Sequence, residues 1–171
     1  MGYEVVAIGM SQGGLQALKV LLGGLPAPFP AAVAIVQHRG KEAEDTLAGL
    51  LEKHSRLPVQ EAEDKMPMVP GHVYLAPADF HLLVEAGRFA LSSEEPVWYA
   101  RPSIDVLFES CADAYGERVI GVILTGANAD GAKGLAAVKA RGGLVIVQDP
   151  ETAENRVMCD AAAAATAVDK V

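Results

Sequence analysis

Residues 3–14 read Y-E-V-V-A-I-G-M-S-Q-G-G, an apolar run that ends in a glycine-rich turn around Ser11. The run is typical of a buried strand, and a helical pattern follows it. The turn fits the G-x-S-x-G pattern, in which glycines allow a sharp strand-to-helix turn that exposes a serine hydroxyl. Such a serine could be a nucleophile, but the same turn could cradle a phosphate at the helix start. The pattern alone leaves both functions open.

Strands and helices alternate along most of the chain. Short apolar runs rich in β-branched residues predict buried strands at residues 5–8, 32–36, 119–124 and 144–147. Helical patterns lie between them, at residues 14–22, 42–54, 104–115 and 132–140. This alternation predicts an α/β fold that is doubly wound and Rossmann-like, with a mainly parallel sheet in three layers.

The middle of the chain departs from that alternation. Residues 66–77 and 81–91 read as hairpin strands around turn residues, which predicts an antiparallel appendage to the sheet. Ser103 follows a proline and is a candidate N-cap for the helix that starts at residue 104. Because no internal repeat or long linker divides the 171 residues, we expect a single domain over residues 1–171.

The composition argues against several classes of protein. Hydrophobic residues make up 51% of the chain and charged residues 21%, a balance that favours a compact core over disorder. A formal net charge of −8 and the lack of a basic stripe argue against nucleic acid or an anionic membrane as the main partner. The sequence has no apolar run of membrane-spanning length and no secretory signal pattern, and its two cysteines lack metal-ligand spacing. We therefore expect a cytoplasmic protein without membrane insertion.

Polar residues with complementary chemistry follow three of the predicted parallel strands. Ser11 follows the first strand, His38 follows the second, and Asp130 lies in the loop after residues 119–124. The carboxyl ends of parallel strands meet at one edge of a sheet, so we expect these side chains to converge. A histidine can take the proton of an attacking serine near neutral pH, and a carboxylate can orient the imidazole. The pattern predicts a Ser-His-Asp nucleophilic site.

Each of these residues also has a simpler explanation. Ser11 could be a helix cap or a phosphate-loop serine, His38 a structural histidine at a strand end, and Asp130 the N-cap of the helix at residue 132. Their coincidence at one edge of the sheet favours catalysis over three separate structural roles. His81 is an alternative base bordering the site, whereas His54 and His72 are predicted to be surface residues.

The segments that carry these residues resemble the catalytic domain of the chemotaxis receptor glutamate methylesterases, the CheB family. The resemblance covers almost the whole chain, and its specificity comes from several ordered motifs rather than any single one. The matching segments are AIGMSQGG (7–14), VQH (36–38), PGHVYLAP (70–77), HL (81–82), RPSIDVLF (101–108), GVILTG (121–126) and DGAKGL (130–135).

The resemblance implies hydrolysis of glutamate 5-O-methyl esters on the cytoplasmic helices of methyl-accepting chemotaxis receptors, with release of methanol. The resemblance also implies deamidation of particular receptor glutamines. The mechanism that it implies uses no metal or other cofactor. By motif position, Ser11 is the nucleophile, His38 the general base and Asp130 the orienting carboxylate. Main-chain groups near Gln12 and Ala127 are the expected oxyanion donors, and Gly13 lines the site.

Several features depart from the family pattern. Gln12 replaces a common threonine, Ala127-Asn128 replaces Met-Gly, and Met158-Cys159 replaces Met-Pro, so we expect the shape of the crevice to differ. Family members usually carry a phosphoacceptor receiver domain before the catalytic strand that begins this sequence. Three explanations are open. The chain could be a fragment of a longer protein, a free-standing enzyme, or an enzyme whose partner is a separate regulatory protein that replaces the receiver domain.

Two other functions remain open from the sequence. A serine triad on this sheet could hydrolyse esters of another substrate class. The chain could also be a non-catalytic module that binds a phosphate or nucleotide, although it lacks both the dinucleotide fingerprint and a G-x-x-x-x-G-K-[ST] loop. For a receptor substrate rich in carboxylates, Arg39 and Arg101 are the candidate docking residues.

Overall fold

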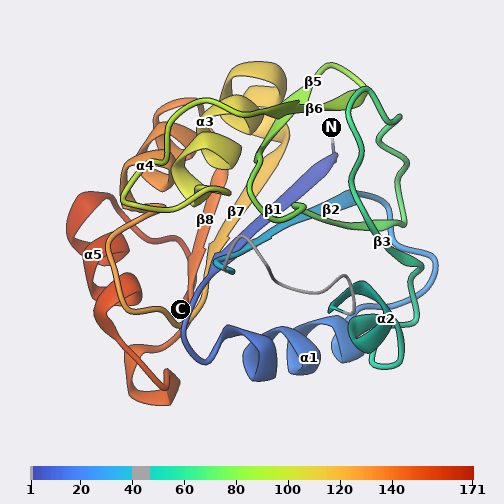
Figure 1. Ribbon diagram of the computed structural model, residues 1–171. Helices are drawn as coiled ribbons and strands as arrows, with labels where there is room; N and C mark the ends of the chain where they lie inside the picture. Colours follow the sequence, from blue (N-terminus) through green and yellow to red (C-terminus); the bar gives the residue numbers. More distant parts are fainter. Residues whose placement is uncertain (1, 40–46) are drawn as a thin grey trace.

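The computed structural model describes residues 2–39 and 47–171. Their main sheet has six strands, all parallel, in the order β3-β4-β2-β1-β7-β8 (Figure 1). The bounds of these strands are Val5–Met10 (β1), Ala32–Gln37 (β2), Val59–Glu61 (β3), Val73–Leu75 (β4), Val119–Ile123 (β7) and Leu144–Val147 (β8). The central strand β1 is buried along its whole length, as its unbroken apolar sequence predicts.

Helices cover both faces of the sheet and complete the three predicted layers (Figure 1). Helices α1 (Gly14–Gly24) and α2 (Leu47–Glu52) lie on one face. Helices α3 (Ile104–Tyr115), α4 (Ala132–Ala140) and α5 (Val157–Ala165) lie on the other, with short 3-10 turns at Gly116–Arg118 and Pro150–Thr152. Successive strand residues point to opposite faces, so Ile8 joins the core beneath α1 while Ala7 joins the core beneath α3.

The antiparallel appendage is a two-stranded hairpin of β5 (His81–Glu85) and β6 (Arg88–Ser92). It packs on α3, because Leu82 and Phe89 share a core with Phe108, and Ser110 Oγ accepts a bond of 2.9 Å from Val84 N. The predicted hairpin strand over residues 81–91 is confirmed as this pair.

The hairpin prediction for residues 66–77 is confirmed only at its start. Pro67 forms an antiparallel bridge with Arg88, and Phe89 N donates to Met66 O and Met68 N to Gly87 O at 2.9 Å each. For residues 73–75 the prediction is wrong. Val73–Leu75 instead forms β4, a parallel strand of the main sheet between β2 and β3. A strand of three residues beside Pro70 and Gly71 resembles a hairpin arm locally, whereas its true partners lie far away in the sequence. The short strand β3 was likewise absent from the predicted elements.

Most of the other predicted elements are confirmed. The ranges 104–115, 132–140 and 144–147 agree with α3, α4 and β8. The helix expected over residues 42–54 appears as α2, which begins at Leu47, and residues 42–46 of that prediction lie outside the described residues.

The parallel register brings the predicted site residues to one edge of the sheet. Met10 of β1 pairs with Gln37 of β2, so Ser11 and His38 are the next residues on adjacent strands. The bond of 3.1 Å from His38 N to Met10 O extends the ladder one step further. Adjacent strands lie about 4.8 Å apart, so the two backbones are neighbours where each strand ends. On the other side of β1, strand β7 leads into the loop that carries Asp130.

Candidate active site

Ser11 lies partly buried at the start of the turn between β1 and α1. Its backbone N–H donates to Thr125 O at 3.0 Å, which ties the turn to the loop after β7. Its hydroxyl oxygen accepts a bond of 2.9 Å from Ala127 N. This contact places a backbone N–H of the loop after β7 directly beside the Ser11 hydroxyl.

His38 and Asp130 are in direct contact. His38 Nε2 lies 2.7 Å from Asp130 Oδ2, and Asp130 is fully buried. Because a carboxylate only accepts hydrogen bonds, the shared proton belongs on Nε2, and Nδ1 keeps a lone pair that can act as a base. No hydrogen bond between described residues joins the His38 ring to Ser11 Oγ. Their backbones are adjacent at the ends of β1 and β2, whereas their side chains line different cavities.

Asp130 also fastens the start of α3. Its Oδ1 accepts from Ser103 Oγ at 2.9 Å and from Asp105 N at 3.0 Å. Its Oδ2 accepts from Ile104 N at 2.7 Å, in addition to His38. The first N–H groups of a helix lack partners within the helix, and here a carboxylate from another segment satisfies two of them. Ser103 occupies the predicted N-cap position, but its hydroxyl donates to Asp130 and does not cap α3.

Asp105, on α3, in turn accepts hydrogen bonds from the start of α4. Its Oδ1 accepts bonds of 3.0 Å from Gly131 N and 2.7 Å from Gly134 N, at the start of that helix. Asp130 is therefore not the cap of the helix that follows it, which was one of the alternatives left by the sequence. The two carboxylates cross-link α3 and α4, and this explains why the loop that presents Asp130 to His38 is held on both sides.

The buried carboxyl group of Asp105 should make the free energy of unfolding depend on pH. Burial is the main cause that raises the pKa of its carboxyl group, and the charges of Asp130 and Glu109 raise it further. The folded state then binds more protons than the unfolded state above the ordinary aspartate pKa of about 4, so this group contributes less stability as the pH rises through that window. In urea unfolding, the stability of Asp105→Asn relative to the parent is expected to improve as the pH rises there. A pH-independent difference would contradict this prediction.

Gly126 leaves room for the Ser11 side chain. A Cβ at this position would lie 2.6 Å from Ser11 Oγ and 2.6 Å from Met158 Cε. Gly13, at the start of α1, has φ +79, and a Cβ there would lie 2.6 Å from Glu154 Cβ. Both glycines are therefore required by geometry, one by close approach and the other by its left-handed backbone as well.

Substitution of Gly126 by alanine is expected to displace Ser11. An atom misplaced by about 1 Å can cost about 100-fold in rate, and overpacking a buried position costs about 1–3 kcal/mol of stability. Ester hydrolysis and chemical unfolding of Gly126→Ala would measure both effects. Gly49→Ala is the matched control, because a Cβ at Gly49 of α2 meets nothing within 4 Å. Parent-like activity in Gly126→Ala would exclude this steric role.

The residues that depart from the family pattern have partners in the structure. Asn128 Oδ1 accepts from Asp130 N at 3.1 Å, and Asn128 is not among the residues with positive φ. The Gln12 side chain accepts from Asn155 Nδ2 at 3.2 Å. Cys159 is buried, with its sulfur 3.5 Å from Leu124 O, and burial raises its pKa to about 11. Asn128 and Gln12 are therefore held in their loops by side-chain hydrogen bonds, and Cys159 packs inside α5.

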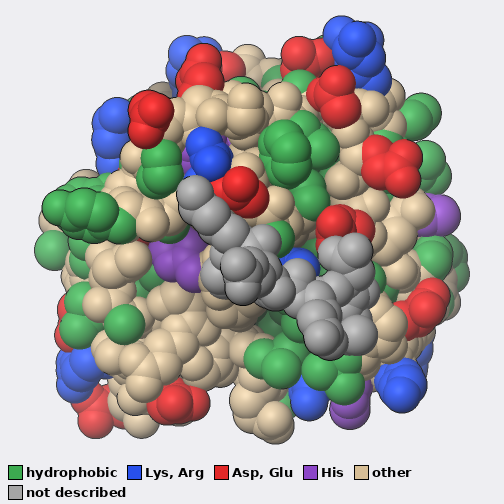
Figure 2. Space-filling model, viewed as in Figure 1, with side chains coloured by type: hydrophobic (Ala, Val, Ile, Leu, Met, Phe, Trp, Pro, Cys, Tyr) green, Lys and Arg blue, Asp and Glu red, His purple; other side chains and the backbone are tan. Residues whose placement is uncertain are grey.

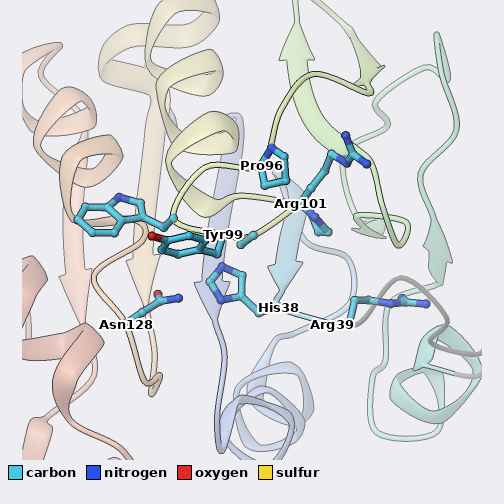
Figure 3. A pocket seen from close by; sticks show the side chains of 9 residues that line it. His38, Arg39, Pro96, Tyr99, Arg101 and Asn128 are labelled. Atoms are coloured by element: carbon cyan, nitrogen blue, oxygen red, sulfur yellow. The ribbon is translucent and has the colours of Figure 1, made fainter.

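A cavity of about 480 Å³ opens beside His38. Arg39 and Arg101 line it, together with Asn128 and the segment 96–102 (Figure 3). Figure 3 shows that both arginine side chains extend away from the His38 ring. Arg101 bonds Asp79 Oδ1 and the carbonyls of two residues in its own loop, and Arg39 Nη1 lies 3.8 Å from Glu61 Oε2. Their predicted docking role stays a prediction.

The other histidines do not offer a second base. His81 is buried, its Nδ1 accepts from Ser103 N at 3.1 Å, and its Nε2 donates to Glu95 O at 2.9 Å. Both ring nitrogens are therefore used, and the alternative of His81 as base is wrong. His54 is exposed as predicted, whereas His72 is half-buried and stacks on Tyr74.

Two residues of the hydrogen-bond network around Asp130 carry little or no signal in the sequence. Asp105 lies in the segment RPSIDVLF, and an acidic residue in a first helical turn was its only visible signal. Its bonds to α4 depend on tertiary packing and have no local pattern. Trp98, whose indole Nε1 donates to Asp105 Oδ2 at 3.2 Å, had no signal at all.

Lys and Arg side chains are interspersed with Asp and Glu on the face shown in Figure 2, without a concentrated basic field. Within residues 2–39 and 47–171, no helix is both long and apolar enough to cross a membrane. The same residues contain no cluster of three or more His, Cys, Asp or Glu side chains suited to a metal ion.

A family model, curated relatives and a solved structure all match this chain to the same family. The family model described as CheB methylesterase matches residues 6–171. A Leptospira interrogans protein, named as a candidate protein-glutamate methylesterase/protein-glutamine glutaminase, is 47% identical over 172 residues, covering 100% of this chain and 89% of that protein. An Anaeromyxobacter dehalogenans protein-glutamate methylesterase/protein-glutamine glutaminase is 45% identical, and its match covers 98% of this chain but 49% of that longer protein.

A solved structure shares the whole fold. The crystal structure of the Thermotoga maritima CheB methylesterase catalytic domain matches with a TM-score of 0.95 and 38% sequence identity. The match covers 100% of this chain and 93% of that chain.

Proposed function

The chain belongs to the CheB methylesterase family, and on that premise we propose that it hydrolyses glutamate 5-O-methyl esters on the cytoplasmic helices of chemoreceptors. The products are a receptor glutamate and methanol. Deamidation of particular receptor glutamines is the second reaction, consistent with the glutaminase in the names of its relatives. The reaction belongs in the cytoplasm, where those receptor helices lie.

The proposed chemistry passes through an acyl-enzyme. Ser11 Oγ attacks the ester carbonyl while His38 Nδ1 takes the hydroxyl proton, and Asp130 stabilises the resulting imidazolium. The tetrahedral intermediate expels methoxide, which receives that proton and leaves as methanol. His38 then takes a proton from water, whose oxygen attacks the acyl carbon. The bond between that carbon and Ser11 Oγ breaks, and the proton on His38 passes to Oγ, which restores Ser11 and releases the glutamate.

Two backbone N–H groups are proposed to stabilise the oxyanion. Ala127 N already lies 2.9 Å from Ser11 Oγ, so it is within reach of an oxygen on the carbon that Ser11 attacks. Gln12 N is the second proposed donor, because Gln12 follows the nucleophile in the turn that leads into α1. Losing one such donor costs about 100-fold to 1,000-fold in rate.

The observation that carries the proposal is the 2.7 Å bond between His38 Nε2 and the buried Asp130. It leaves Nδ1 as the basic nitrogen, on the strand next to the one that delivers Ser11. A catalytic serine–histidine bond is often long without substrate and tightens in the complex. The mechanism therefore requires His38 Nδ1 to come within hydrogen-bond reach of Ser11 Oγ when substrate binds.

The proposal is tested with methylated receptor and a covalent serine probe. The parent is expected to release methanol from methylated receptor faster than it cleaves a panel of small esters at equal concentration. A fluorophosphonate should label Ser11, and His38→Ala should abolish the labelling. Labelling without receptor hydrolysis would favour an esterase of another substrate class, and the lack of both would favour a binding module.

A further inference from the structure

The segment 97–100 forms a tight turn at the mouth of the His38 cavity. Val97 and Ala100 exchange two backbone hydrogen bonds of 2.9 Å each, with Trp98 and Tyr99 between them. Trp98 has φ 52 and Tyr99 has φ 60, so both central residues are left-handed. Asparagine and glycine are the usual residues of such a turn, and bulky aromatic residues are rare there. Local conformational preference therefore does not explain why two aromatic residues occupy this turn.

Packing in the core does not explain them either. Trp98 is 53% exposed and Tyr99 is fully exposed, at 103%. Two large apolar surfaces held towards solvent in an unfavourable backbone conformation point to a contact outside the chain.

The turn is nevertheless held firmly in place. The Trp98 indole donates to Asp105 Oδ2, and Asp105 in turn holds the start of α4. Arg101 donates to the carbonyls of Ser93 and Glu94 at 2.8 and 3.0 Å, which fixes the segment before the turn. A side chain presented by such a pre-ordered loop loses little conformational entropy when it binds.

The turn also lies where a macromolecular substrate must approach. Trp98 and Tyr99 line the same cavity as His38, and the Tyr99 ring lies next to the His38 ring in Figure 3. A glutamyl methyl ester is short, so a helix that presents it to Ser11 must bring its own surface against the rim of this cavity. A small ester that enters the cavity alone needs no such contact.

We propose that Tyr99 docks the substrate helix beside the methylated glutamate, and that Trp98 is a positioning residue that holds the turn through Asp105. This inference rests on the proposed function and names the residue that selects its substrate. An uncharged aromatic ring suits this task, because the chain carries a net charge of −8 and the hydrolysed glutamate is itself a carboxylate. A rigid aromatic side chain gives a large contact area without like-charge repulsion.

The test compares methylated receptor with 4-nitrophenyl acetate as substrates. Tyr99→Ala is expected to raise KM for the receptor on the order of 10-fold with little change in kcat, and to leave hydrolysis of the small ester within about 2-fold. Tyr99→Phe should retain the parent values, because the ring rather than the hydroxyl makes the contact. Tyr3→Ala is the matched control. Tyr3 is also exposed (42%), but it precedes β1 and so lies at the amino ends of the strands, away from the site at their carboxyl ends.

A double variant separates the rings from the turn itself. Trp98→Asn with Tyr99→Gly supplies the residues that favour this turn, so the backbone keeps its shape while both rings are lost. This variant is expected to show the same selective rise in KM for the receptor. A parent-like KM for the receptor in both Tyr99→Ala and the double variant would overturn the docking proposal, and so would an equal loss on both substrates. Failure of the proposed function is distinct, because then the parent itself would release no methanol from methylated receptor.

Discussion

Ser11→Ala is expected to lower kcat for ester hydrolysis by about a million-fold, close to the effect of removing a serine nucleophile in other serine hydrolases. Without the hydroxyl no acyl-enzyme forms, and only the oxyanion donors and substrate binding remain. Those groups alone support about 1,000-fold to 10,000-fold catalysis over water, so a small residual rate is expected. Methanol release from methylated receptor and turnover of 4-nitrophenyl acetate measure the loss.

The same substitution should leave the fold intact. The only bond to the Ser11 hydroxyl between described residues comes from Ala127 N, and Ala127 is exposed, so water can replace the lost acceptor. The free energy of unfolding is therefore expected to change by no more than about 1 kcal/mol. Ser93→Ala, at an exposed serine in another loop, is the matched control. A Ser11→Ala protein that hydrolyses either ester at the parent rate would refute the nucleophile assignment.

The sequence predicted the parallel strands well because their signal is local. Residues 144–147 and the run of β1 carry the unbroken apolar pattern typical of strands in a parallel sheet. β1 is buried along its whole length, whereas the edge strand β8 buries Val145 and Val147 and leaves Leu144 and Ile146 half-buried. Strand β4 was misread because three residues hold too little pattern to tell a parallel strand from a hairpin arm. Its pairing with β2 and β3 is decided by tertiary contacts.

The placement of the candidate site residues at one edge of the sheet was predictable for the same reason, whereas their catalytic roles stay a prediction. Ser11, His38 and Asp130 follow apolar runs, and the geometry of parallel sheets brings such residues to one edge. The support around Asp130 was not predictable, because Asp105 and the N-terminus of α3 reach it only through the packing of α3 against α4. The left-handed turn at Trp98 and Tyr99 contradicts local propensity, and such conflicts are expected where function overrides conformational preference.

Asp130→Asn is the second substitution with a large expected effect. The side chain accepts four hydrogen bonds, two on each oxygen, and an amide offers only one accepting atom. The favoured orientation places the amide oxygen towards His38 and Ile104, since the Ser103 hydroxyl can rotate to accept from the amide. Asp105 N then loses its acceptor. His38 keeps its orientation but loses the negative charge that stabilises its protonated form during attack.

We therefore expect Asp130→Asn to lower kcat by about 1,000-fold to 10,000-fold with a smaller change in KM. The orphaned N–H and the lost charge at the start of α3 should also cost about 1–3 kcal/mol of stability. Steady-state hydrolysis of 4-nitrophenyl acetate and urea unfolding measure the two effects separately. Asp113→Asn is the control, because Asp113 lies on α3, the helix that Asp130 fastens, with a side chain that is 69% exposed and forms an ion pair with Arg141. If stability fell while kcat stayed at the parent value, Asp130 would serve only to fasten α3, and His38 would act without a carboxylate.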